Sequence, residues 1–180
     1  MSDEDRLYDL IDLKIVLPCY NVTQPNIALA QTCDSKTFKL YVTDIGLFST
    51  MIFDEGKGIS SDIYKKLLSN SLSADLGYMY ENAIAQIIAS TGRNLYYHTW
   101  RKENSAHSNE IDFLIRSKNK IIPIEVKSSA TNRHVSIDDF CEKYSHEVGR
   151  RILFLQKDFS NDGMLEFKSI YAALFVLNQF

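Results

Sequence analysis

The stretch "NEIDFLIRSKNKIIPIEVKSS", residues 109–129, places charged side chains inside runs of Ile, Val, Phe and Leu. Asp112 lies in the first of these runs, and Glu125 and Lys127 lie in the second. A charge in an apolar strand costs several kcal/mol unless it is paired, hydrogen-bonded or bound to a metal ion. These three residues are therefore the first candidates for a functional site.

The composition is that of a soluble globular protein, with 45% hydrophobic and 24% charged residues in a chain of 180. No apolar stretch approaches the roughly 20 residues needed to cross a bilayer, and the opening "MSDEDRLYDL" is acidic where a signal peptide is basic and then apolar. We expect a cytoplasmic protein with no membrane contact. The three cysteines are widely spaced and lack a C-x-x-C pair, which gives no support to a zinc site or a disulfide framework.

The charge is unevenly distributed along the chain. The net charge is -3, yet residues 91–133 hold eight Lys and Arg against four Asp and Glu. A basic region within an acidic chain fits local contact with phosphate groups, although solvated strand ends explain it equally well. The sequence has no G-x-x-x-x-G-K-[ST] phosphate loop, so we expect no ATP hydrolysis by this chain.

The apolar pattern predicts an ordered series of elements after an irregular start. Residues 1–36 contain a short helical piece and the apolar strand "KIVLPCY", which we expect to pair with "KTFKLYV" outside the central sheet. A helix is expected from residue 71 to Gly92, followed by strands at 94–100, 110–117 and 120–128, a helix from residue 136 and a strand at 151–156. The core order is therefore helix, three strands, helix, strand, in an α/β fold.

The alternation of side chains in strands suggests a cation site. Glu125 and Lys127 share one face of their strand, and a tight turn at "SKNK" would bring Asp112 to the same face of the neighbouring strand. Two carboxylates placed together repel unless a cation lies between them, and Mg²⁺ prefers such oxygen ligands. The alternative is an ion pair between Lys127 and one of the two carboxylates at a strand edge.

An Asp followed by E-x-K on the next strand, within this order of elements, resembles the PD-(D/E)XK nuclease-like superfamily. The resemblance covers residues 72–157 and implies a restriction-endonuclease-like core with a mixed central sheet flanked by helices. It also implies catalytic roles for Asp112, Glu125 and Lys127 and a Mg²⁺ or Mn²⁺ ion. The ion would be held by Asp112, Glu125, the Val126 carbonyl and Glu81 on the first helix.

Several segments more narrowly resemble the C-terminal domain of unknown function attached to bacterial and archaeal AAA-type ATPases. These segments are "KLYVTDIGL", "GYMYENAIAQII", "NLYYHTWRKENSAHSNEIDFLI", "IIPIEVKSS" and the late "ILFL". The resemblance implies that residues 1–36 are a winged-helix remnant or linker, that residues 37–180 form the nuclease-like domain, and that an ATPase module belongs to the same full-length chain.

Two classes of function follow from these resemblances. The first is a metal-dependent DNA phosphodiesterase, with Arg101, Lys102 and Arg133 contacting the flanking phosphates. The second is a non-catalytic module that binds nucleic acid or a protein and couples it to the ATPase.

Overall fold

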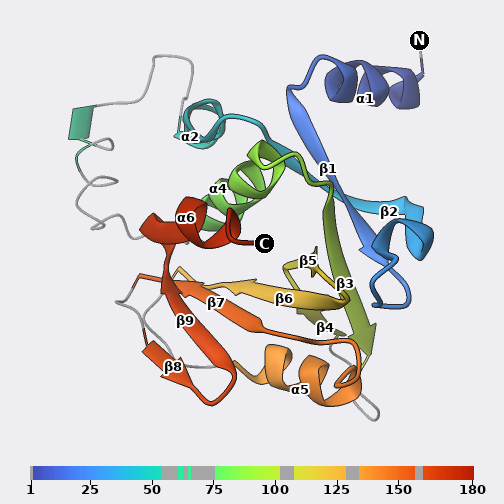
Figure 1. Cartoon of the computed structure of the whole chain (residues 1–180). Helices are drawn as coiled ribbons and strands as arrows, with labels where there is room; N and C mark the ends of the chain where they lie inside the picture. The colour runs from blue at the N-terminus through green and yellow to red at the C-terminus, as the bar shows by residue number, and fades with distance from the viewer. Residues whose placement is uncertain are drawn as a thin grey trace.

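The computed structural model describes residues 2–53, 61–62, 65, 76–101, 108–128, 134–156 and 160–180. These residues form a mixed α/β fold with two mixed sheets (Figure 1). Within this part of the chain, no helix is long and apolar enough to cross a membrane.

The first sheet has the strand order β2-β1-β3-β4. Its strands are β1 (Val16–Val22), β2 (Cys33–Val42), β3 (Leu95–Arg101) and β4 (Ser108–Ile111). β1 pairs antiparallel with β2, as the sequence predicted, but it also pairs in parallel with β3. The expectation that residues 1–36 stay outside the central sheet is therefore wrong, and the physical reason is that Cys19 and Val22 of β1 are fully buried in the core. The winged-helix origin of these residues stays a prediction.

The second sheet has the order β5-β6-β7-β9-β8. It contains β5 (Phe113–Ser117), β6 (Lys120–Val126), β7 (Arg151–Leu155), β8 (Ser160–Asp162) and β9 (Leu165–Ser169). The predicted turn at "SKNK" is a tight hairpin in which Ser117 pairs with Lys120 and Lys118 has a positive φ of 54°.

The predicted strand over 110–117 is divided at Asp112 into β4 and β5. Ile111 lies in one core cluster and Phe113 in the other, so the alternation of faces breaks between them. The sequence predicted a single central sheet. Because of this break the structure has two sheets, which approach each other where β3 lies beside β5. The predicted order of helix, three strands, helix and strand is present apart from this break.

Helices cover both faces of the β5–β7 region (Figure 1). Helix α4 (Gly77–Ser90) contributes Ile84, Ala85 and Ile88 to a core that also contains Ile124. Helix α5 (Val135–Lys143) packs Ile137 and Phe140 into a second core on the opposite face. Because alternate residues of the strands enter different cores, both faces of these strands are buried, as their nearly continuous apolar sequence indicates.

Two of the remaining helices are peripheral, and the last one contributes Ala173, Val176 and Leu177 to the core that α4 joins. Helix α1 (Asp3–Asp12) begins with a capping box between Ser2 and Asp5 and has no buried residue. Helix α2 (Ile45–Phe53) follows Asp44, whose carboxylate caps it by accepting a hydrogen bond of 2.6 Å from the Leu47 amide. Helix α6 (Ala173–Leu177) packs against α4 near the end of the chain.

His98 is a buried, neutral histidine of β3. Its Nδ1 donates to the Val22 carbonyl at 2.5 Å, and its Nε2 accepts a hydrogen bond of 3.1 Å from the Tyr144 hydroxyl. Burial lowers the pKa of His98 below its ordinary value of 6.5, and the charge of Lys143 adds to this effect against the opposing Val22 contact. Both ring nitrogens are thus satisfied in the neutral form.

We expect the free energy of unfolding to decrease as the pH falls below about 6.5. In that range the unfolded chain protonates this histidine while the folded chain resists protonation, so the unfolded state binds more protons. Urea unfolding at a series of pH values should show this decrease in the wild type and a weaker one in His98→Gln. An equal pH dependence in both proteins contradicts the assignment.

Candidate metal site

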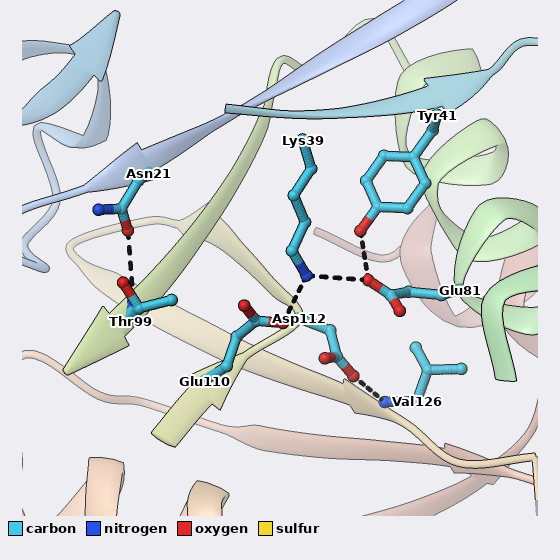
Figure 2. Close-up of polar contacts among 8 residues, drawn as sticks. All are labelled: Asn21, Lys39, Tyr41, Glu81, Thr99, Glu110, Asp112 and Val126. Atoms are coloured by element: carbon cyan, nitrogen blue, oxygen red, sulfur yellow. Dashed lines mark hydrogen bonds and ion pairs between the residues drawn. The ribbon is translucent and has the colours of Figure 1, made fainter. Parts of the chain in front are cut away.

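Three carboxylates meet at the junction of the two sheets. Glu81 comes from α4, Glu110 from β4, and Asp112 from the break between β4 and β5. One oxygen of each lies within 4.8 Å of the others, and all three side chains are half-buried. Figure 2 shows Glu81 and Glu110 approaching from different elements. We call Glu81, Glu110 and Asp112 the acidic cluster.

Helix α4 is held in place by a buried amide next to Glu81. The Asn82 side chain accepts a hydrogen bond of 2.8 Å from the Val42 amide and donates one of 2.9 Å to the Val42 carbonyl. Asn82 is only 1% exposed, so these bonds satisfy backbone groups that would otherwise be buried without partners. The contact fixes the register of α4 against the end of β2 and thereby positions Glu81.

Strand β2 supplies two further polar side chains to the cluster. The Lys39 ammonium lies 3.2 Å from Glu81 Oε1, and it also donates to Glu110. The Tyr41 hydroxyl donates to the same Glu81 oxygen (Figure 2). Lys39 and Tyr41 are two residues apart, which places both on one face of the strand. One protein cation thus lies between two of the three carboxylates.

The electrostatics of the site follow from burial and from this crowding of charge. Burial first, and then the charge of Glu81, raise the pKa of Asp112 to about 8, although the hydrogen bond from the Val126 amide opposes the rise. Burial lowers the pKa of Lys39, but Glu81 and Glu110 outweigh it and raise that pKa above its ordinary value. Burial and Glu81 raise the pKa of Tyr41, so its hydroxyl remains a donor. Burial and the neighbouring carboxylates therefore favour the protonated form of the Asp112 carboxyl.

Asp112 also connects the cluster to β6. Its Oδ2 accepts a hydrogen bond of 2.7 Å from the Val126 amide. Ile124 and Val126 pack in the core on the α4 side, and Glu125 between them lies outside the group of oxygens within 4.8 Å of one another, although, besides burial, the charge of Glu125 raises the pKa of Asp112 and that of Lys127 lowers it. Glu125 is accordingly not part of the acidic cluster.

Glu125 is paired with Lys127 instead. Glu125 Oε1 lies 2.5 Å from the Lys127 ammonium, and the Glu125 side chain is only 4% exposed. Its other oxygen, Oε2, is buried and has no hydrogen-bond partner among the residues that the structure describes. An ion pair of this kind is the alternative to a cation site that the sequence allows, and the role of Glu125 as a metal ligand stays a prediction.

The predicted nucleic-acid contacts are only partly placed. Arg101 is exposed at the end of β3. Lys102 and Arg133 lie outside the described residues. Their contact with phosphates stays a prediction.

Three residues of this site were not predicted from the sequence. Glu110 was absent from the predicted ligands, and Lys39 and Tyr41 were absent from the predicted site. The alternation in "KLY" of β2 was the available signal, because it puts a cation and a hydroxyl on one face of a strand. Only the tertiary structure brings that face to α4.

The fold and the site define a mixed α/β domain that carries a half-buried acidic cluster. The family model for a domain of unknown function, DUF4143, matches residues 76–170, and the chain belongs to this family. That range contains all three residues of the acidic cluster together with Glu125 and Lys127. The searches of curated proteins and of solved structures returned no match to the chain.

Proposed function

We propose that this domain binds Mg²⁺ or Mn²⁺ through the acidic cluster and hydrolyses phosphodiester bonds in DNA. The observation that carries the proposal is the convergence of three carboxylate oxygens within 4.8 Å from three separate elements. Carboxylate oxygens are the ligands that these cations prefer. The pKa of Asp112 is raised first by burial and then by the charge of Glu81, and a divalent cation would relieve the second of these contributions.

The roles of the chain's own residues follow from their positions. Glu81, Glu110 and Asp112 would hold the cation, which supplies Lewis-acid stabilisation of the phosphate and a more acidic bound water. Lys127, aligned by Glu125 at 2.5 Å, would orient the attacking water or a phosphate oxygen. Arg101 is exposed at the end of β3 and would contact a flanking phosphate.

The resemblance to the domain attached to AAA-type ATPases also suggests a partner for this domain. We propose that the domain acts on DNA together with an ATPase module of the same full-length chain. The printed sequence has no phosphate loop, which agrees with this proposal, because the ATPase module would then hydrolyse the nucleotide.

A cleavage assay tests the enzymatic proposal. We expect the purified protein to cut labelled single-stranded or duplex DNA when Mg²⁺ or Mn²⁺ is present and not in EDTA. Asp112→Asn should reduce cleavage to the metal-free background, because it removes one of the three ligands. Glu142→Gln, which removes an exposed carboxylate of α5, should cleave like the wild type. Cleavage by Asp112→Asn at the wild-type rate contradicts the assignment.

A second function, a non-catalytic module that binds nucleic acid or protein, is favoured by one observation. The Lys39 ammonium already contacts Glu81 and Glu110 and so provides a positive charge at the cluster. In a purely structural network this contact would tie β2 to α4 and β4. Metal-dependent stabilisation without cleavage of any DNA form would favour this class over the phosphodiesterase.

A further inference from the structure

A cavity of about 760 Å³ lies apart from the acidic cluster. It is formed by the loop 27–31, the start of β3, the β5–β6 hairpin and Phe180. None of the acidic-cluster residues lines it, and neither Glu125 nor Lys127 does. We call it the Arg116 cavity.

The charged residues that line the Arg116 cavity are all cations, namely Arg93, Arg116 and Lys118. Arg93 is held by hydrogen bonds to Thr91 Oγ1 and to the Phe180 backbone oxygen. Arg116 and Lys118 are exposed, and neither side chain has an ion pair or a hydrogen bond within the described chain. Two uncompensated cations therefore line a cavity whose described side chains include no acid, while the Phe180 backbone oxygen is held by Arg93.

The walls of the cavity are apolar and partly aromatic. Leu29, Leu114 and Ile115 are buried and form part of the lining. Tyr96 and Phe180 are half-buried and also belong to the lining, and the Arg150 guanidinium lies over the Phe180 ring at 4.6 Å from its centroid. An inorganic anion would engage the cations but leave this apolar wall uncovered, whereas a flat organic group would cover it.

We propose that the Arg116 cavity binds a small organic phosphate of mononucleotide size. Its volume falls within the roughly 300–1,000 Å³ typical of small-molecule sites. The planar guanidinium of Arg116 suits two-pronged hydrogen bonding to phosphate, and Lys118 adds a second positive charge. The flat part of the ligand packs against the apolar wall. This site is independent of the proposed metal-dependent activity, since the two share no residue.

Calorimetric titration of the protein with AMP in metal-free buffer tests the proposal, with adenosine and inorganic phosphate as separate arms. We expect saturable one-to-one binding of AMP and weaker binding of each fragment. Arg116→Glu should weaken AMP binding by about 10-fold or more, because it replaces a charge-assisted hydrogen bond with repulsion. Lys118→Asn should weaken it less, while Asn still tolerates the positive φ of the turn.

Two controls make the result specific. Lys36→Glu reverses an exposed charge on β2 outside the cavity and should leave AMP binding unchanged. Asp112→Asn should also bind AMP like the wild type, which separates this site from the acidic cluster. Amide shifts in the wild-type NMR spectrum should concentrate in residues 27–31 and 114–118, a readout that needs no variant.

The proposal is overturned if AMP shows no saturable binding or if Arg116→Glu binds it as tightly as the wild type. Equal affinity for inorganic phosphate and AMP would reduce the site to a simple anion contact and reject the organic ligand. Binding of single-stranded DNA without binding of AMP would likewise reject it in favour of a polymer site.

Discussion

Asp112→Asn is expected to abolish stabilisation by Mg²⁺ and Mn²⁺ while leaving the metal-free fold as stable as the wild type or more stable. A cation that binds the folded protein alone stabilises it by about 2.7 kcal/mol at a concentration of 100 times its Kd. The variant should lose this gain because an amide is a weaker ligand than a carboxylate. Thermal unfolding of both proteins with and without metal measures the difference.

The expected metal-free stability of this variant follows from the Asp112 pKa. That pKa is raised to about 8 in the folded protein, above the ordinary value of 3.8. Between these values the folded state binds more protons than the unfolded state, so this group lowers wild-type stability as the pH rises from about 4 to 8. Asn resembles the protonated carboxyl and still accepts a hydrogen bond from the Val126 amide, so it removes that loss.

Glu142→Gln serves as the matched control for Asp112→Asn, because it removes an exposed carboxylate outside the cluster. Its response to metal should equal that of the wild type. A strongly destabilised Asp112→Asn, together with a wild type that shows no response to metal, would contradict the metal site. The cluster would then be a structural ion-pair network.

Lys39→Met is expected to destabilise the metal-free protein and to enlarge its stabilisation by metal. Lys39 is 28% exposed, and its partners Glu81 and Glu110 are 17% and 35% exposed, so the contacts are only partly desolvated. Loss of one partner from such a network costs roughly 1–3 kcal/mol, less than for a fully buried pair. A divalent cation should recover this loss, because the carboxylates are then free of their internal cation.

The comparison with Lys36→Met makes this prediction specific to the cluster. Lys36 is exposed on the same strand, so its replacement should change neither stability nor the metal response appreciably. The result that speaks against a metal site is a destabilised Lys39→Met that added metal does not recover. That outcome would mean that Lys39 stabilises the carboxylates in a purely structural role.

Local features of the fold were predictable from local sequence. Asp44 caps α2, Gly92 follows the end of α4, and the hairpin at "SKNK" forms where the turn residues indicate it. The parallel pairing of β1 with β3 was not predictable, because strands separated by more than 70 residues leave no periodic signal of their contact. The break at Asp112 was equally hidden, since polar and apolar residues alternate without interruption from Glu110 to Phe113.

The site was predictable only in part, because some of its contacts also join segments that are far apart in the sequence. Asp112 stood out as a charge inside an apolar run, and Glu81 stood at the edge of a helix expected to dock beside it. Lys39 and Tyr41 belong to a strand 40 or more residues away from Glu81, so their contact depends on how β2 meets α4. The Asn82 side chain holds the end of β2 against α4 through its hydrogen bonds to Val42. A buried asparagine in a helix carries no distinguishing pattern in the sequence.

The most direct measurement is calorimetric titration of Mg²⁺ into the wild type and into Asp112→Asn, at a pH above the Asp112 pKa of about 8 so that the wild-type carboxylate is ionised. We expect one Mg²⁺ to bind per wild-type chain and no saturable binding to the variant. Absence of binding to the wild type, or equal binding to both proteins, would contradict a metal site at Glu81, Glu110 and Asp112.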